Sequence, residues 1–305
     1  MRDGLRRTDA FRRDLTFGPI TISFEGMEGH QLAGLDAVSR GKQGPEEQPR
    51  WLFRAGASVP ERFRLDVSFS PRLDPPWTTN PMWLDFDRET QSYRSPRAFW
   101  ETEIFESLSS SSSRATMAMG PHPREEGAFG WRISLREATS GLLSAVAPCA
   151  NALLLHGCGL VHPEDGRARV FLGQSGAGKS TMNRRLADWE LLGDDKVLVW
   201  LEGDELIACG TPFMSKNLFR GWGEPHPIES FYALQPGAVE LKLEELPKAE
   251  AFRTLLQCSF LPYGEGPLVE RALEIAQGFL DRVTWKSLAS NLDHDLSACF
   301  EAVSS

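Results

Sequence analysis

Residues 173–181 of the chain are GQSGAGKST, a segment that fits the pattern GxxxxGKS. The apolar residues 170–172 (VFL) precede it and are suited to a strand, and residues 182–190 (MNRRLADWE) are compatible with a helix. A strand, a glycine-rich loop and a helix in this order arrange backbone N–H groups around an anion. The sequence therefore predicts a phosphate-binding loop within an α/β fold.

The loop offers both backbone and side-chain contacts to a triphosphate. Glycines let the backbone approach a phosphate closely, and the N–H groups of the loop then point at the anion. We expect Lys179 to place its charge on the β- and γ-phosphates, and the Ser180 hydroxyl to bind Mg²⁺. A glycine-rich turn without a ligand is the alternative. The predicted nucleotide-binding residues are Gly173, Ser175, Gly176, Ala177, Gly178, Lys179, Ser180 and Thr181.

Two adjacent acidic residues, Asp194 and Asp195, follow Lys179 by 15 and 16 residues. This spacing has room for one short helix at 181–189 before a strand at 196–200. Consecutive residues on a strand point in opposite directions, so the two carboxylates can do different work. One can bind Mg²⁺ and the other can accept the proton of an attacking hydroxyl. A solvated acidic turn is the alternative.

His156 lies 17 residues before Gly173, at the predicted boundary between a helix and a strand. Strands at 158–161 and 168–172, joined by a turn at 163–167, would form a hairpin that folds back on the loop. The hairpin would bring His156 to the mouth of the loop. A histidine there is either a structural residue or a catalytic one.

The pattern divides the chain into a β-rich region, residues 1–135, and an α/β region with a mixed sheet, residues 136–305. The first region has predicted strands at 17–24, 62–69 and 82–87, separated by proline and glycine clusters. The second is predicted to open with a buried helix over 136–155. Further elements are predicted as strands at 205–209, 230–234, 239–243 and 283–288, and helices at 248–260, 267–280 and 293–303.

Composition excludes several classes of protein. The net charge is −9, which does not suit a general nucleic-acid binder or an anionic membrane surface. Apolar runs stop short of the ~18 residues that a membrane span needs, and the N-terminus has no apolar signal region. The five cysteines form no CxxC pair, which favours free thiols in a reducing compartment. We expect a cytoplasmic protein without nucleic-acid or membrane partners.

The order of the motifs resembles the HPr kinase/phosphorylase family, whose domain is related to the phosphoenolpyruvate carboxykinases. His156-Gly157, the loop at 173–180 and the pair Asp194-Asp195 fall on that family's motifs in order and at similar spacing. The match covers residues 140–300. The resemblance implies a P-loop kinase core of the HPr kinase type with a mixed sheet, preceded here by the β-rich N-terminal region.

The resemblance also implies an activity and roles for the site residues. The protein would be a kinase that uses ATP and Mg²⁺ to phosphorylate a hydroxyl, that of a serine in a protein or peptide. Asp194 would be the base, and His156 and Lys179 would act near the transferred phosphate. Ser180 and Asp195 would bind Mg²⁺. A homo-oligomer is an option, because HPr kinases assemble into rings.

Thr181 stands where HPr kinases have a glutamate after GKS. The chain is therefore more similar to the HPr-kinase-related branch that includes serine kinases tailoring ribosomally made peptides. Two other interpretations stay open: a nucleotide-binding regulatory protein without phosphotransfer, and a kinase of a small-molecule hydroxyl. A broad groove beside the acids would indicate a peptide acceptor, and a closed pocket would indicate a metabolite.

Overall fold

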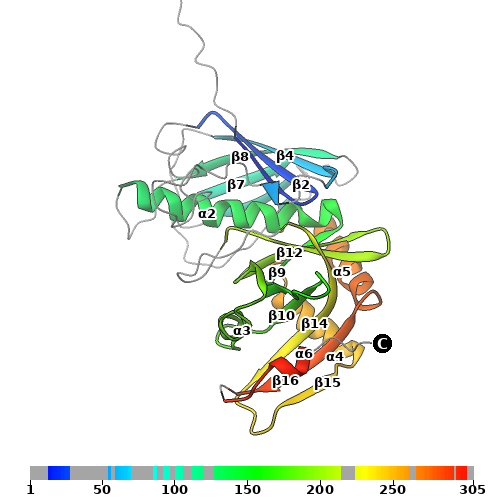
Figure 1. The fold of residues 1–305 in the computed structure, drawn as a ribbon. Coiled ribbons are helices and arrows are strands. Elements are labelled where there is room, and N and C mark those ends of the chain that lie inside the picture. Colours follow the sequence, from blue (N-terminus) through cyan, green and yellow to red (C-terminus); the bar gives the residue numbers. More distant parts are fainter. Residues whose placement is uncertain are drawn as a thin grey trace, which may run out of the picture.

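The structure is a computed structural model, and it describes residues 13–27, 54–55, 59–69, 85–87, 92–96, 100–105, 111–119, 127–213, 224–261, 266–291 and 293–300. Within these residues the chain is a mixed α/β protein with two mixed β-sheets. The long helix α2 (Gly127–Val146) runs between the sheets (Figure 1).

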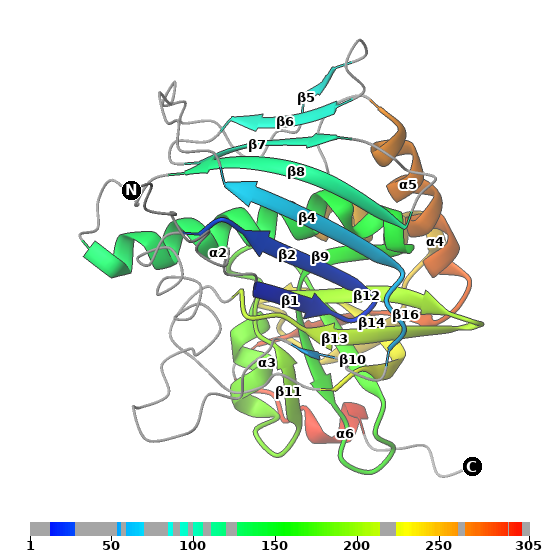
Figure 2. The same cartoon turned by 90° about the horizontal axis from the view of Figure 1, so that it is seen from above.

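The N-terminal sheet has the described strand order β3-β1-β2-β4-β8-β7-β6-β5. Strands β2, β4 and β8 run parallel to one another, whereas β5 to β8 form an antiparallel meander. Figure 2 shows this sheet from above, with α2 beneath it. Its strands are β1 (Arg13–Phe17), β2 (Ile20–Glu25), β3 (Arg54–Ala55), β4 (Phe63–Phe69), β5 (Asp85–Asp87), β6 (Ser92–Pro96), β7 (Trp100–Phe105) and β8 (Ser112–Met119).

Side-chain alternation turns one face of this sheet toward α2. Phe63, Leu65 and Val67 of β4 are buried, and the residues between them are partly exposed, as a strand with one covered face requires. The apolar face of the sheet packs in one core with Leu135 and Leu142 of α2.

The second sheet carries the phosphate-loop motif and has the described order β10-β9-β12-β13-β14-β16-β15, with β11 paired to β9. Because β14 pairs with β13 at its start and in parallel with β10 further along, the path of strands closes on itself. Its strands are β9 (Ala152–Val161), β10 (Ala168–Leu172), β11 (Glu190–Gly193), β12 (Lys196–Glu202), β13 (Glu205–Gly210), β14 (His226–Pro236), β15 (Lys242–Glu245) and β16 (Thr284–Ser290).

Helices cover both faces of the second sheet. α4 (Lys248–Cys258) and α5 (Pro267–Leu280) pack against one face, and α3 (Lys179–Arg185) and α6 (Ser297–Phe300) pack against the other. The five cysteines are free thiols. In the part of the chain that the structure describes, no helix combines the length and apolarity needed to cross a membrane.

The strands at 158–161 and 168–172, the hairpin that they form, and the helix at 267–280 are confirmed. The buried helix predicted over 136–155 is confirmed as far as Val146 and is wrong beyond it. α2 ends at Val146, a 3₁₀ turn (η1, Ala147–Ala150) contains Pro148, and Asn151 adopts a left-handed conformation with φ 58°. Proline removes a helical donor, and asparagine tolerates the reversal, so the chain turns into β9 at this point. His156 consequently lies inside a strand.

The strand predicted at 17–24 is confirmed from Ile20 as β2, but its first residues belong to the end of β1 and to a turn. A turn at Gly18, with φ 49°, separates β1 from β2, and the two strands pair as a hairpin. Strands β6, β7 and β8 had not been predicted. The division of the chain at residue 135 stays a prediction, and that position falls within α2.

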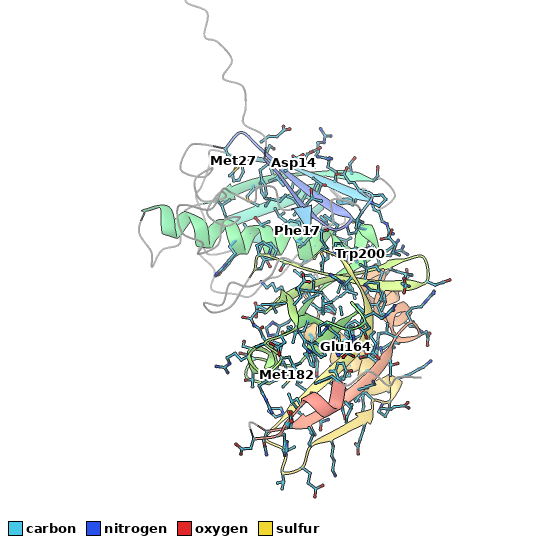
Figure 3. All side chains as sticks on the ribbon, in the orientation of Figure 1. Asp14, Phe17, Met27, Glu164, Met182 and Trp200 are labelled. Carbon is cyan, nitrogen blue, oxygen red and sulfur yellow. The ribbon has the colours of Figure 1, made fainter. Side chains whose placement is uncertain are left out.

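Trp200 of β12 joins the two halves of the molecule. Its ring is fully buried in the core shared with α2 and the N-terminal sheet, close to Phe17 (Figure 3). A Cβ atom at Gly18 would lie 2.8 Å from the Trp200 ring. Arg62 adds a polar link, because its Nη1 donates to the Leu201 carbonyl at 2.7 Å. The position of β12 therefore depends on the N-terminal sheet.

We expect Trp200→Ala to lower the free energy of unfolding by about 3–5 kcal/mol, because it empties a large, fully enclosed site. Urea denaturation measures the loss. Val239→Ala, at a side chain that is 90% exposed, is the control and should change stability by less than about 0.5 kcal/mol. Equal effects of the two substitutions would contradict this account of the core.

Candidate functional site

The paired acids lie at a break in a strand. β11 and β12 both pair antiparallel with β9, and Asp194 and Asp195 occupy the gap between them. The Gly157 N–H donates to the Asp195 carbonyl at 3.1 Å, which places the acids opposite His156 and Gly157. Irregularities of this kind re-aim side chains and are frequent beside active sites.

The glycine-rich loop connects β10 to α3. Gly176 and Gly178 have φ values of 87° and 100°, which glycine adopts without strain. The Gly178 carbonyl accepts a hydrogen bond from the Thr181 N–H at 2.9 Å, which starts α3. The loop is tight, because a Cβ atom at Gly173 would lie 2.6 Å from that of Ala177.

Lys179 is held beneath the loop. Its side chain is almost fully buried, with 7% of the residue exposed, and Nζ donates to the carbonyls of Gly173 at 2.6 Å and Gln174 at 3.0 Å. Burial lowers the pKa of Lys179, and the nearby Cys258 thiol and Asp195 carboxylate act in the opposite direction. The ammonium group therefore lies within electrostatic reach of both the loop and the acids.

Asp194 is the more buried of the two acids, with 3% of the residue exposed. Burial raises the pKa of its carboxyl group, against the effect of a hydrogen bond from Ser180. Its Oδ1 has no hydrogen-bond partner among the described residues. A buried, unpartnered carboxylate oxygen beside a hydroxyl is a suitable donor set for Mg²⁺, which prefers oxygen ligands.

The described residues contain no group of three or more histidine, cysteine, aspartate or glutamate side chains arranged to hold a metal ion. Mg²⁺ commonly takes one or two protein carboxylates and completes its shell with phosphate oxygens and water. Ser180 and Asp194 therefore fit a cation that arrives with a nucleotide, and they do not form a closed metal cage.

His156 contacts the second acid. Its Nδ1 is 3.2 Å from the Asp195 carbonyl oxygen and 3.3 Å from Asp195 Oδ1. Because a carbonyl oxygen only accepts, we assign the ring hydrogen to Nδ1. Burial and the charge of Lys179 lower the pKa of His156, against the effect of Asp195. The imidazole is thus neutral at pH 7 and orients the Asp195 side chain.

Sequence reasoning missed the surroundings of His156. Lys196 pairs with it across β9 and β12, and Lys196 Nζ donates to Ser140 of α2 at 2.8 Å. Lys196 Nζ also lies 4.7 Å from the centre of the Phe260 ring, which packs nearly perpendicular to the His156 ring. The position of Lys196 directly after the acids was visible in the sequence. Its partners, distant along the chain, were not.

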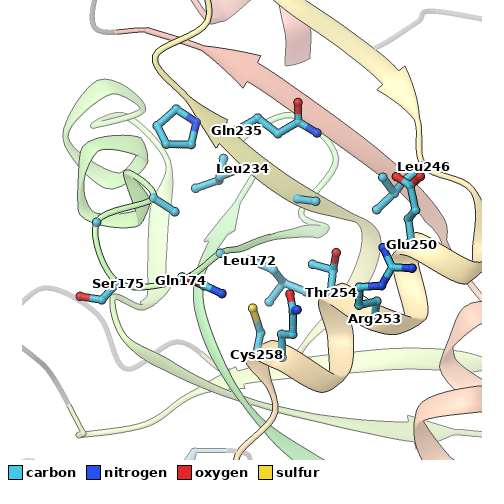
Figure 4. A pocket seen from close by; sticks show the side chains of 16 residues that line it. Leu172, Gln174, Ser175, Leu234, Gln235, Leu246, Glu250, Arg253, Thr254 and Cys258 are labelled. Carbon is cyan, nitrogen blue, oxygen red and sulfur yellow. The ribbon is translucent and has the colours of Figure 1, made fainter.

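The structure brings His156, Lys179, Ser180, Asp194 and Asp195 together beside the point where β9 changes its pairing partner. Thr181 is turned along α3, where its Oγ1 accepts from Arg184 at 3.3 Å. Four of the remaining predicted loop residues border a cavity of about 560 Å³ against α4 and β14 (Figure 4): Gly173, Ser175, Gly176 and Ala177. Gly178, the fifth, does not border the cavity and lies at the N-terminal end of α3.

No family model matches the chain, and no curated protein matches it. Among solved structures, the HPr(Ser) kinase/phosphatase from Coxiella burnetii is similar over 48% of this chain and 89% of its own, with 14% identity and a TM-score of 0.27. A structural similarity this distant does not indicate a function. The function is therefore inferred from the geometry of the site alone.

We expect Asp194→Asn to stabilise the protein at neutral pH in metal-free buffer. The folded-state pKa of Asp194 lies above its unfolded value, so the ionised carboxylate opposes folding once the pH exceeds about 4. The gain in unfolding free energy should be present at pH 7 and vanish as the pH falls below the unfolded pKa. Urea titrations across this range measure it.

Asp165→Asn provides a control of opposite sign. A two-pronged hydrogen bond from Arg169, with both distances 2.6 Å, lowers the pKa of Asp165. Its ionised form therefore favours folding above the unfolded pKa, and this contribution is lost as the pH falls through the folded pKa. Asp165→Asn should destabilise at pH 7. If both variants shift the free energy of unfolding in the same direction, burial does not raise the pKa of Asp194.

Proposed function

We propose that the chain is an ATP-dependent kinase that transfers the γ-phosphate to a hydroxyl, that of a serine in a protein or peptide. One observation carries the proposal: a buried lysine, a hydroxyl, two acids and a neutral histidine meet beside a glycine-rich loop. A loop alone would support nucleotide binding, whereas the added acids supply the groups that phosphoryl transfer needs.

The donor half of the reaction would rest on the loop, Lys179, Ser180 and Asp194. The loop N–H groups and the Lys179 ammonium would bind the phosphates, with phosphate oxygens replacing the loop carbonyls that Nζ now contacts. Ser180 and Asp194 would hold Mg²⁺. When bound, Mg²⁺ would neutralise charge on the β- and γ-phosphates.

The family resemblance implies that Asp194 is the base and that Asp195 binds the metal. The contacts support the reverse assignment. Asp194, almost fully buried beside Ser180, suits the cation. Asp195 has a side chain that is 14% exposed and is held by His156, and it suits the role of base. The oxygen of the acceptor hydroxyl would bond to the γ-phosphorus, and Asp195 would accept the proton that this hydroxyl loses. The bond from that phosphorus to the bridging oxygen breaks, and ADP leaves.

We expect Lys179→Ala to weaken binding of ATP with Mg²⁺ and to abolish transfer. Asp195→Asn should keep nucleotide binding and reduce transfer by about 10²–10⁴-fold, as expected for loss of a general base. Calorimetry measures binding, and labelled phosphate incorporated into a serine-containing peptide library measures transfer. The exposed Asp188→Asn is a matched control and should behave as the unchanged protein.

Three results would contradict parts of this proposal. Nucleotide binding without label on any peptide or small-molecule hydroxyl would indicate a regulatory protein. Label on a small-molecule hydroxyl but on no peptide would change the acceptor class. Retention of transfer in Asp195→Asn, together with its loss and normal binding in Asp194→Asn, would restore Asp194 as the base.

A further inference from the structure

A cavity of about 560 Å³ opens on the side of the loop that faces α4 and the end of β14. Figure 4 shows Gln174 and Ser175 on one wall, Leu234 and Gln235 on a second, and Thr254 and Arg253 of α4 on a third. The volume falls within the range of small-molecule pockets. The groups proposed to carry out phosphoryl transfer do not use this cavity.

The cavity and the reacting groups both adjoin the loop, but no residue belongs to both. Gly173 to Ala177 border the cavity, whereas His156, Ser180, Asp194 and Asp195 do not. If the phosphates run from the acids along the loop toward residues 173–177, the far end of a bound triphosphate reaches the cavity. The part of the donor beyond the α-phosphate is the nucleoside.

The walls of the cavity have the chemistry of a nucleoside site. Apolar surface comes from Leu172, Leu234 and Leu246, which suits the faces of a heteroaromatic base. Amides and a hydroxyl supply donors and acceptors for the edge of a base and for ribose hydroxyls. These polar groups are Gln174, Gln235, Thr254 and Gln257.

Cys258, at the end of α4, ties the cavity to the phosphate site. Its thiol receives a hydrogen bond from the backbone of Gly173 and lies near the charge of Lys179. Burial nevertheless raises the pKa of Cys258, so the thiol is neutral at pH 7 and does not repel an anionic ligand. The chain after α4 is anchored to β9, because the Phe260 N–H donates to the Leu154 carbonyl at 2.8 Å.

We propose that this cavity binds the base and ribose of the nucleotide donor. This inference rests on the proposed function, since it takes the loop to bind the phosphates. It makes α4 the element that distinguishes a nucleoside triphosphate from a bare polyphosphate. A peptide in the cavity is the competing occupant, and the experiment separates the two.

The test compares ATP with inorganic tripolyphosphate, each with Mg²⁺, by calorimetry. The unchanged protein should bind ATP at least about tenfold more tightly than tripolyphosphate. The double variant Thr254→Leu, Gln257→Leu narrows the cavity and removes two polar groups. It should lose that advantage for ATP and keep its affinity for tripolyphosphate. Ala249→Leu, on the exposed side of the same helix and outside the cavity, is the matched control and should retain the preference.

The failures of the two proposals are distinguishable. Equal affinities for ATP and tripolyphosphate in the unchanged protein, or unaltered ATP affinity in the double variant, would overturn the nucleoside site and leave the phosphate loop intact. Binding of neither ligand would overturn the proposed function itself. Photolabelling with 8-azido-ATP adds a direct readout: the label should fall on peptides from α4 or β14, and a label confined to other segments would overturn the assignment.

Discussion

The pairing of β9 is the constraint on which the rest of the site depends. This ten-residue strand pairs with β12 along its first half and with β10 and β11 along its second half. The change of partner falls at His156 and Gly157. Because β11 and β12 are consecutive in the chain, the residues between them must lie opposite that point, and these residues are the two acids. The same strand also fixes the start of the loop, since Leu172 pairs with Gly157.

The site also contains charged groups whose burial raises the free energy of the folded state. Burial disfavours the ionised forms of both Lys179 and Asp194, as their shifted pKa values indicate. Buried charges without full pairing destabilise a fold and are retained where they serve binding or catalysis. Both shifts oppose the charged forms, and a bound anion at Lys179 or a bound cation at the unpartnered Asp194 oxygen would offset this cost. The resulting loss of stability is the expected counterpart of function.

Much of the site was predictable from the sequence because its motifs are local. The spacing within 173–181 specifies a loop, and the position of the acids one short helix later predicts their approach to it. The change from helix to strand after Val146 was not predictable, because an apolar run suits a buried helix and a buried strand equally. The 3₁₀ turn at Ala147–Ala150 and the left-handed Asn151 separate the helix from the strand. Strands such as β8 (SSRATMAM) have few strand-forming residues, and their pairing depends on neighbours that the local sequence does not reveal.

The cavity shows a different limit of sequence reasoning. Cys258 and Thr254 lie more than seventy residues after the loop and belong to a helix that has no motif of its own. They reach the loop because α4 packs across the second sheet and its end is bonded to β9. Contacts of this kind come from tertiary packing, which periodicity within a single helix does not specify.

The most direct test of the central claim is a crystal structure with a non-hydrolysable ATP analogue and Mg²⁺. The account predicts phosphates along residues 173–180, the cation between Ser180 and Asp194, and the γ-phosphate facing Asp195 and His156. Phosphates bound away from the loop, or a cation that contacts neither Ser180 nor Asp194, would contradict it.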